Sequence, residues 1–253
     1  MSEKPRLYAD LAWLWPMWGD HRDEYARYSA HITRLIRQYA RRPVASLLDI
    51  SCGGGKNVFN LKHAFQVTGL DLSPVMLNLA SSLNPECEFI IGDMRTFSLD
   101  RKFDAVVMDD GISYMLNRTD LAEAMGNAFS HLEPGGVLIA TPDVTTETFR
   151  QNLTTCTPGV REYQPEGVDV VFVQNVYDPD PRDEQYESTM IYLIREHGRL
   201  RVETDRHVLG IFSRNVWMQV LIDVGFEVHC EAFTDGENEY IMFACVKKSD
   251  ATC

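Results

Sequence analysis

Two hydrophobic patterns alternate along the first 145 residues. Compact apolar runs that end in Gly, Asp or Ser are typical of strands buried on both faces. These runs occupy residues 45–51, 66–71, 87–93, 102–110 and 135–143. Apolar residues spaced three or four apart, which predict helices, occupy residues 56–65, 73–83 and 118–132. The residues Ser73-Pro74 and Thr119 mark two of the helix starts.

The pattern changes in the second half of the chain. Three β-rich runs separated by turn signals lie within residues 168–212, and they predict a three-stranded antiparallel insertion. A helix at 213–225 and two strands at 226–232 and 240–248 follow. The whole order predicts an α/β fold with a Rossmann-like, mostly parallel seven-stranded sheet flanked by helices. Such sheets bind ligands beyond the carboxyl ends of their strands.

We expect three parts in this chain. Residues 44–145 and 213–248 form the Rossmann-like core, and residues 146–212 form the inserted sheet, which serves either as a substrate roof or as a dimer face. Residues 1–43 form an aromatic-rich helical lid, which includes an amphipathic helix at 22–42.

The N-terminal part has more large rings than a solvated tail would carry. One interpretation is a lid whose rings wall the acceptor chamber and stack on a cation. The other is a helix that simply buries its aromatic face on the core. On the first interpretation, the substrate-binding residues are Tyr8, Trp15, Trp18 and Tyr25.

A run of three glycines follows the first predicted strand, in "LLDISCGGGKNVF" at 47–59. A strand-to-helix turn offers unpaired backbone N–H groups, and glycine lets a ligand approach them closely. The dinucleotide fingerprint is incomplete, because Gly53 and Gly55 would be followed by Val58 in place of a third glycine. No Gly-Lys-Ser/Thr follows the strand either, which excludes a Walker A loop.

Acidic residues at the ends of the next two strands point to an adenosine ligand. Asp71 lies about twenty residues beyond the glycines, where an acid accepts hydrogen bonds from two ribose hydroxyls. Asp93 ends the third strand and would accept from an exocyclic amine, while Met94 packs against a flat ring. The set predicts a site for an adenosine that carries a non-phosphate tail.

These motifs together resemble the S-adenosylmethionine-dependent methyltransferases of Rossmann-like fold. The resemblance covers residues 43–145 and rests on "DISCGGG", Asp71, Asp93 and "HLEPGGVLIAT". The layout is similar to that of the N,N-dimethyltransferases that act on nucleotide-linked amino sugars. Ser51 stands where the family usually has glycine. The cofactor implied is S-adenosylmethionine, with S-adenosylhomocysteine as product, and its expected site consists of Asp49, Ser51, Gly53, Gly55, Asp71, Leu72, Asp93, Met94, Met108 and Asp109.

The methyl acceptor is expected at the end of the fourth strand, in "MDDGISYM". Adjacent carboxylates there would hold a cationic amine and take its proton, so Asp110 is a candidate base, with Tyr114 beside it. His207 is a second candidate base, from the inserted sheet. Asp110 could instead cap a turn, and His207 could be a packed strand residue.

We therefore expect transfer of a methyl group to a small-molecule acceptor, with an amine preferred. A hydroxyl or carboxylate acceptor stays open, as does a non-catalytic protein of the same fold that only binds the adenosyl ligand. An NAD(P)-dependent oxidoreductase is disfavoured by Val58.

The amino-acid composition limits the kinds of partner that we expect this protein to bind. The 253 residues carry 24 basic and 37 acidic side chains, a net charge of −13, which opposes nucleic-acid binding. The six cysteines show no metal-ligand spacing, so we expect reduced thiols and no metal. No stretch is long enough for a membrane span, and we expect a cytoplasmic monomer or homodimer.

Overall fold

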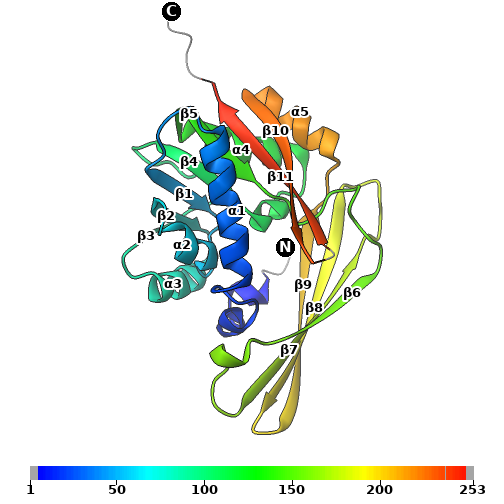
Figure 1. Cartoon of the computed structure of the whole chain (residues 1–253). Coiled ribbons are helices and arrows are strands. Elements are labelled where there is room, and N and C mark those ends of the chain that lie inside the picture. Colours follow the sequence, from blue (N-terminus) through cyan, green and yellow to red (C-terminus); the bar gives the residue numbers. More distant parts are fainter. Residues whose placement is uncertain (1–4, 237, 249–253) are drawn as a thin grey trace, which may run out of the picture.

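The larger sheet of the computed structural model, which describes residues 5–236 and 238–248, has seven strands in the order β10-β11-β5-β4-β1-β2-β3 (Figure 1). Neighbours are parallel except β11, which is antiparallel to both β5 and β10. The strands are β1 Ser46–Ile50, β2 Gln66–Asp71, β3 Glu88–Ile91, β4 Phe103–Met108, β5 Leu132–Ala140, β10 Phe226–Asp235 and β11 Asn238–Lys247. The predicted Rossmann-like sheet is confirmed.

Helices cover both faces of this sheet, because successive strand residues point in opposite directions. Leu47 belongs to the core shared with α1 and α2, and Leu48 to the core shared with α4 and α5. Ser73 caps α3 by accepting a hydrogen bond from the backbone N–H of Met76, with Pro74 in the first turn, as predicted. The helices are α1 Glu24–Tyr39, α2 Lys56–Leu61, α3 Pro74–Leu83, α4 Arg118–Ser130 and α5 Arg214–Val224.

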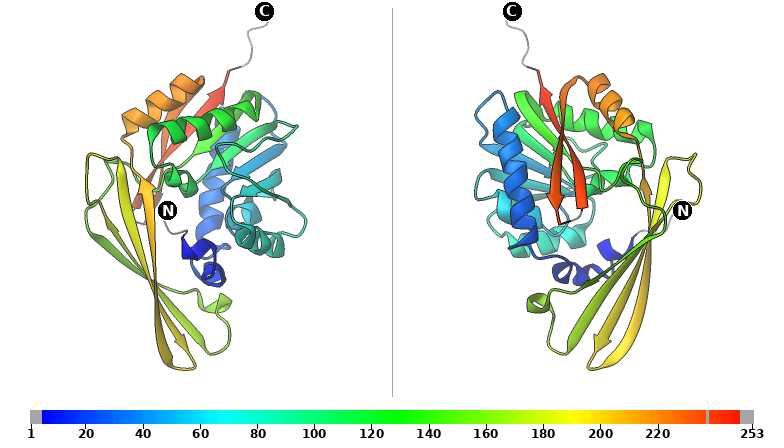
Figure 2. Two further views of the ribbon diagram at one scale, coloured as in Figure 1. Left: turned by 180° about the vertical axis from the view of Figure 1, so that it is seen from behind. Right: turned by 45° about the vertical axis from the view of Figure 1, so that its right-hand side comes forward.

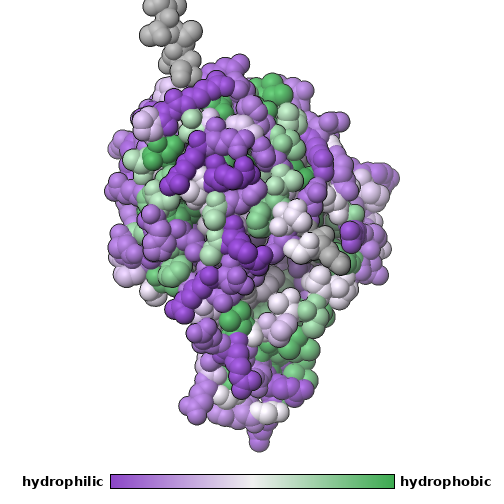
Figure 3. Space-filling model, in the orientation of Figure 1, coloured by the Kyte–Doolittle hydropathy of each residue, from purple (hydrophilic) through white to green (hydrophobic). Residues whose placement is uncertain are grey.

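The inserted sheet is antiparallel and has four strands, so the prediction of three strands was wrong. The strand that the sequence did not reveal is β6, whose six residues are all exposed and therefore show no apolar periodicity. The strands are β6 Leu153–Pro158, β7 Val168–Tyr177, β8 Gln185–Glu196 and β9 Arg199–Gly210. Figure 2 shows this sheet extending well beyond the core, and Figure 3 shows it as a narrower lower lobe.

Two short 3₁₀ helices, η1 Arg6–Tyr8 and η2 Ala12–Met17, lie between the core and the inserted sheet (Figure 2). Their aliphatic side chains, such as Leu7 and Leu14, are buried in a separate cluster with Phe172 and Tyr192 of the inserted sheet. The N-terminal segment therefore gives the inner face of the insertion its hydrophobic cover. Within the described residues no helix has the length and hydropathy needed to cross a membrane.

Helix α5 holds the hairpin side of the large sheet through Trp217, which is 1% exposed and stacks on Phe243 with ring centroids 5.5 Å apart. We expect Trp217→Ala to lower the free energy of unfolding by about 3–5 kcal/mol, because it leaves a cavity in the core. Ile222→Ala on the same helix is the matched control, since Ile222 is 50% exposed and its loss should change stability by less than about 0.5 kcal/mol. Urea denaturation measures both, and equal losses would contradict this assignment.

Candidate active site

Five carboxyl groups gather at the carboxyl edge of the parallel strands. Asp49 is next to the last residue of β1, Asp71 ends β2, Asp109 and Asp110 follow β4, and Asp143 lies beyond the end of β5. Burial raises the pKa of all five carboxyl groups, and neighbouring negative charge raises the pKa of Asp49 and of Asp110 further. The edge is therefore an environment that favours a bound cation. Asp143, which lies beyond the end of β5, is the member that the sequence analysis missed.

The glycine turn lies beside Asp71. Gly53 and Gly55 have left-handed backbone conformations, and so does Ser51, with φ of 64°. The backbone N–H groups of Gly53 and Ser73 each donate to a different oxygen of Asp71, at 2.8 Å. Asp71 thus joins the turn to the start of α3, and each of its oxygens keeps a second lone pair for a ribose hydroxyl.

Trp15 of the N-terminal segment covers the same turn. A Cβ on Gly54 would clash with the indole ring, so a side chain of this chain itself requires glycine here. The indole nitrogen of Trp15 is buried and has no hydrogen-bond partner among the described residues.

Lys56, the first residue of α2, holds the N-terminal segment in place. Its side chain is buried, and its ammonium group donates to the backbone carbonyls of Trp15 at 3.0 Å, of Gly19 at 2.9 Å and of Trp18. Burial lowers the pKa of Lys56 to about 8, while the three carbonyls stabilise its charged form. Lys56 was not among the predicted site residues.

Asp109 contacts two helices. Its carboxylate accepts from the Tyr28 hydroxyl of α1 and, at 2.9 Å, from the Asn57 amide of α2. These bonds hold the two helices over the end of β4. The neighbouring carboxyl group differs, because no side chain of the described residues makes a comparable pair of bonds to Asp110.

Asp110 faces a cavity between the large sheet and the inserted sheet. The predicted catalytic residues Asp110, Tyr114 and His207 all line this cavity, together with the predicted substrate residues Tyr8 and Trp18. Its other lining residues are Leu7, Gly111, Ser113, Asp143, Gln174, Ser188, Met190 and Leu209. None of the lining residues is Lys or Arg.

The imidazole of His207 is bonded at both nitrogens. The Tyr114 hydroxyl lies 2.6 Å from its Nδ1, and the Asp205 carboxylate lies 3.0 Å from its Nε2. Sequence reasoning missed Asp205, although a residue two positions away on a strand shares the face of His207.

The remaining predicted residues lie outside this cavity. Trp15 is on the glycine turn, and the ring of Tyr25 lies 5.3 Å from the Lys56 ammonium. The carboxylate of Asp93 accepts from the guanidinium of Arg95. The side chains of Met94 and Met108 pack in or against the core, whereas Leu72 is 67% exposed beside Asp71.

S-adenosylmethionine fits the residues at this edge. One carboxylate oxygen of Asp49 is buried without a hydrogen-bond partner among the described residues, which suits the positive charge of the cofactor. Exposed Leu72 and Ile91, at the ends of adjacent strands, offer apolar surface for the adenine ring. Asp71 would hold the ribose.

Comparison with known proteins defines the class. Residues 47–136 match the family model described as a methyltransferase domain. Structures that share the fold have been solved with S-adenosylmethionine or S-adenosylhomocysteine bound. The predicted resemblance is thus confirmed for residues 47–136, which carry the methyltransferase domain.

Several of the similar proteins are named as N-methyltransferases of sugars. Over 129 residues the chain is 40% identical to the dTDP-3-amino-3,4,6-trideoxy-alpha-D-glucopyranose N,N-dimethyltransferase of Streptomyces venezuelae, covering 50% of this chain and 54% of that protein. The chain spans about half the length of the first curated relatives it matches. The structure of DesVI from Streptomyces venezuelae is similar over 94% of this chain and 95% of its own, with a TM-score of 0.78 and 27% identity. The sugar N-methyltransferase KedS8 from Streptoalloteichus sp. ATCC 53650 is similar over 98% and 96%, with a TM-score of 0.79 and 25% identity.

The Lys56 contacts lead to a test of how the N-terminal segment is held. We expect Lys56→Met to speed proteolytic cleavage within the first twenty residues about tenfold or more, because three carbonyls lose a charged donor. Lys62→Met is the control, since Lys62 pairs with Glu86 on the surface of the core. Limited proteolysis followed by mass spectrometry compares the variants. Equal cleavage in the two would show that Lys56 does not hold the segment.

The raised pKa values of these carboxyl groups predict the direction of proton exchange when a cationic ligand binds. Carboxyl groups with raised pKa hold protons at mildly acidic pH, and a bound cation lowers their pKa and expels those protons. We expect S-adenosylmethionine to release more protons than S-adenosylhomocysteine, which lacks the sulfonium charge. Calorimetric titration at about pH 6, above the ordinary Asp value, in buffers of different ionisation enthalpy measures this difference. Asp110→Asn should reduce it, and equal proton release by the two ligands would contradict the assignment.

Proposed function

We propose that this chain transfers a methyl group from S-adenosylmethionine to the amine of a small molecule. The observation that carries the proposal is the cavity at the carboxyl edge, where Asp110 and Asp143 face rings of Tyr8, Trp18 and Tyr114 and no basic side chain lines the wall. Two carboxylates and aromatic faces are the groups that attract an ammonium ion.

Each part of the cavity has a role in this chemistry. When bound, the cofactor supplies an electrophilic methyl carbon, whose bond to sulfur breaks as the amine nitrogen attacks, and S-adenosylhomocysteine leaves. Asp110 and Asp143 hold the acceptor, while the N-terminal rings exclude water and keep the nitrogen in line. Asp110, Tyr114 and His207 are the groups positioned to accept a proton from the amine.

We further propose an amino sugar as the acceptor. The curated relative named above is an N,N-dimethyltransferase of a dTDP-linked amino sugar. In the cavity, the Gln174 amide donates to the Ser188 hydroxyl at 2.9 Å, and this polar pair on the inserted sheet is suited to sugar hydroxyls. A carboxylate acceptor is disfavoured, because Asp110 and Asp143 would repel it.

The test is turnover with a panel of amino sugars, both free and dTDP-linked, in the presence of S-adenosylmethionine. We expect release of S-adenosylhomocysteine and an acceptor that gains methyl groups on nitrogen, detected by mass spectrometry and NMR. Asp110→Asn should lower kcat/KM for the amine by about 30-fold or more, because a charged contact is lost. Glu123→Gln, an exposed carboxylate on α4, is the control and should leave kcat/KM unchanged.

Two results would contradict the proposal. Binding of the cofactor without turnover of any amine would favour the non-catalytic alternative. Methylation on oxygen would instead show that the carboxylates do not select the acceptor.

A further inference from the structure

Three side chains form a continuous hydrogen-bonded chain that leads out of the acceptor cavity. The Tyr114 hydroxyl contacts His207 Nδ1, and His207 Nε2 contacts Asp205 Oδ2. Tyr114 and His207 line the cavity, whereas Asp205 is not among the lining residues. Asp205 therefore acts on the acceptor only through His207.

We propose that Asp205 is a positioning residue that sets the tautomer of His207, so that Tyr114 and His207 together carry the acceptor's proton out of the cavity. This inference rests on the proposed function, because it concerns the proton that an amine acceptor must lose.

The local fold places these groups. Asp205 and His207 are two residues apart on β9, so their side chains share the face that looks toward the core, and both are 5% exposed. Tyr114 closes the 3₁₀ helix that follows β4 and so reaches the same point from the large sheet. The ring of Tyr8 packs edge-on against both Tyr114 and His207, with centroids 5.8 and 5.9 Å away.

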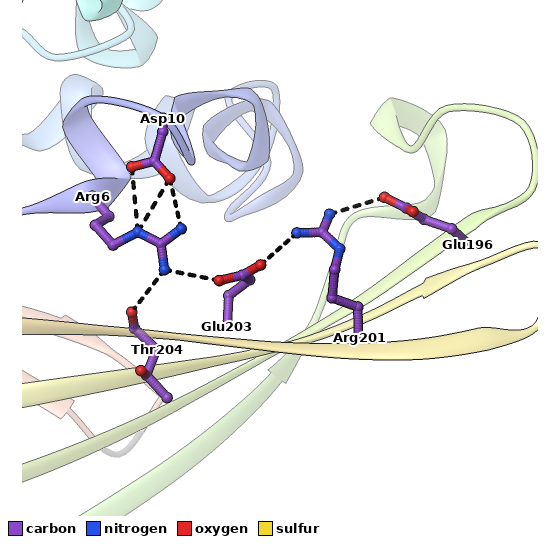
Figure 4. A network of polar contacts seen from close by, with 6 residues as sticks. All are labelled: Arg6, Asp10, Glu196, Arg201, Glu203 and Thr204. Carbon is purple, nitrogen blue, oxygen red and sulfur yellow. Dashed lines mark hydrogen bonds and ion pairs between the residues drawn. The ribbon is translucent and has the colours of Figure 1, made fainter.

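The N-terminal segment completes the surroundings of Asp205. The backbone N–H of Leu7 donates to Asp205 Oδ2 at 2.7 Å. Next to it, Arg6 bonds to Glu203, and Glu203 bonds in turn to Arg201, which ties the segment to β9 (Figure 4). Leu7 and His207 therefore contact the same oxygen of Asp205, whose side chain is buried.

For a neutral imidazole, the donors and acceptors allow one arrangement. Burial by itself raises the pKa of a carboxyl group, but hydrogen bonds from His207 and from the backbone N–H groups of Arg6 and Leu7 hold the pKa of Asp205 below its ordinary value. A carboxylate only accepts, so His207 must carry its proton on Nε2. Nδ1 then has a free lone pair, and the Tyr114 hydroxyl at 2.6 Å donates to it.

The proton transfer balances without a further reactant. An ammonium acceptor gives one proton to the phenol oxygen of Tyr114 as the phenol proton passes to His207 Nδ1. The amine is left with a lone pair, Tyr114 is unchanged, and His207 becomes an imidazolium beside the Asp205 carboxylate. The lone pair forms the N–C bond to the methyl carbon, and the electrons of the broken S–C bond stay on sulfur.

The first measurement needs no cofactor or acceptor. Nitrogen-15 NMR of protein labelled at histidine, at about pH 8.5, reads the tautomer of each neutral imidazole. The His207→Gln variant assigns the His207 signals. We expect His207 to be protonated at Nε2, and we expect Tyr114→Phe to shift the Nδ1 resonance by removing its donor. A His207 protonated at Nδ1 would overturn the proposal.

The second measurement is kinetic. We expect Asp205→Asn to lower kcat about 100-fold while KM for the amine and Kd for S-adenosylmethionine stay within about twofold, because a neutral amide stabilises the imidazolium poorly. The Asn side chain still accepts from Leu7, so the N-terminal segment stays docked. Glu203→Gln, on the same strand and bonded to Arg6, is the matched control and should keep full kcat.

The outcomes separate the two proposals. Full kcat in Asp205→Asn, or an equal loss in Glu203→Gln, would overturn the role of Asp205. Absence of turnover in the unmodified protein, with His207 protonated at Nε2, would leave the hydrogen-bonded chain intact and overturn the proposed function instead.

Discussion

The gathering of negative charge at the carboxyl edge of the large sheet is the constraint on which the rest of the structure depends. Five aspartates converge there because parallel strands end on one side. Asp49 and Asp71 are buried, Asp109 and Asp143 are partly buried, and Asp110 is exposed. A charge that is removed from water without compensation is costly. Asp71 and Asp109 are compensated by donors from the protein, while Asp49 keeps an oxygen without a partner. A cationic cofactor and a cationic acceptor would neutralise the negative charge that the fold leaves without a partner.

The N-terminal segment converts this open edge into an enclosed site. It reaches the glycine turn through Trp15, the start of α2 through Lys56, and the inserted sheet through Leu7. The backbone carbonyl of Tyr8 also accepts from Ser73, the cap of α3 next to Asp71. One short stretch of chain therefore contacts the elements that hold the cofactor and those that would accept the proton.

The inserted sheet supplies part of the lining of the cavity next to the cofactor edge. The core offers the cofactor edge, but Gln174, Ser188 and His207 come from the insertion. On the proposed function, substrate choice would reside in a sheet that lies far from the glycine turn in the sequence. This division agrees with the general rule that function lives in sites added to a fold rather than in the fold itself.

The local sequence predicted those features that depend on neighbours along the chain. Apolar periodicity identified all seven strands of the large sheet, and strand-end positions identified Asp49, Asp71 and Asp110, because both signals are local. The edge strand β6 was not predicted, because an exposed strand needs no apolar pattern. The same limit applies to Asp143, whose importance depends on lying opposite Asp110 across a cavity.

Tertiary structure alone decided the pairings between distant residues. The bonds from Tyr28 and Asn57 to Asp109, from Lys56 to the carbonyls of the N-terminal segment, and from Asp205 to His207 each require elements to meet in space. The sequence by itself determined the elements, the glycine turn and the acids at the strand ends. Packing alone decided which acid holds helices together and which acid is left to bind a ligand. The reason is that hydrogen bonds form between groups that the fold brings within about 3 Å.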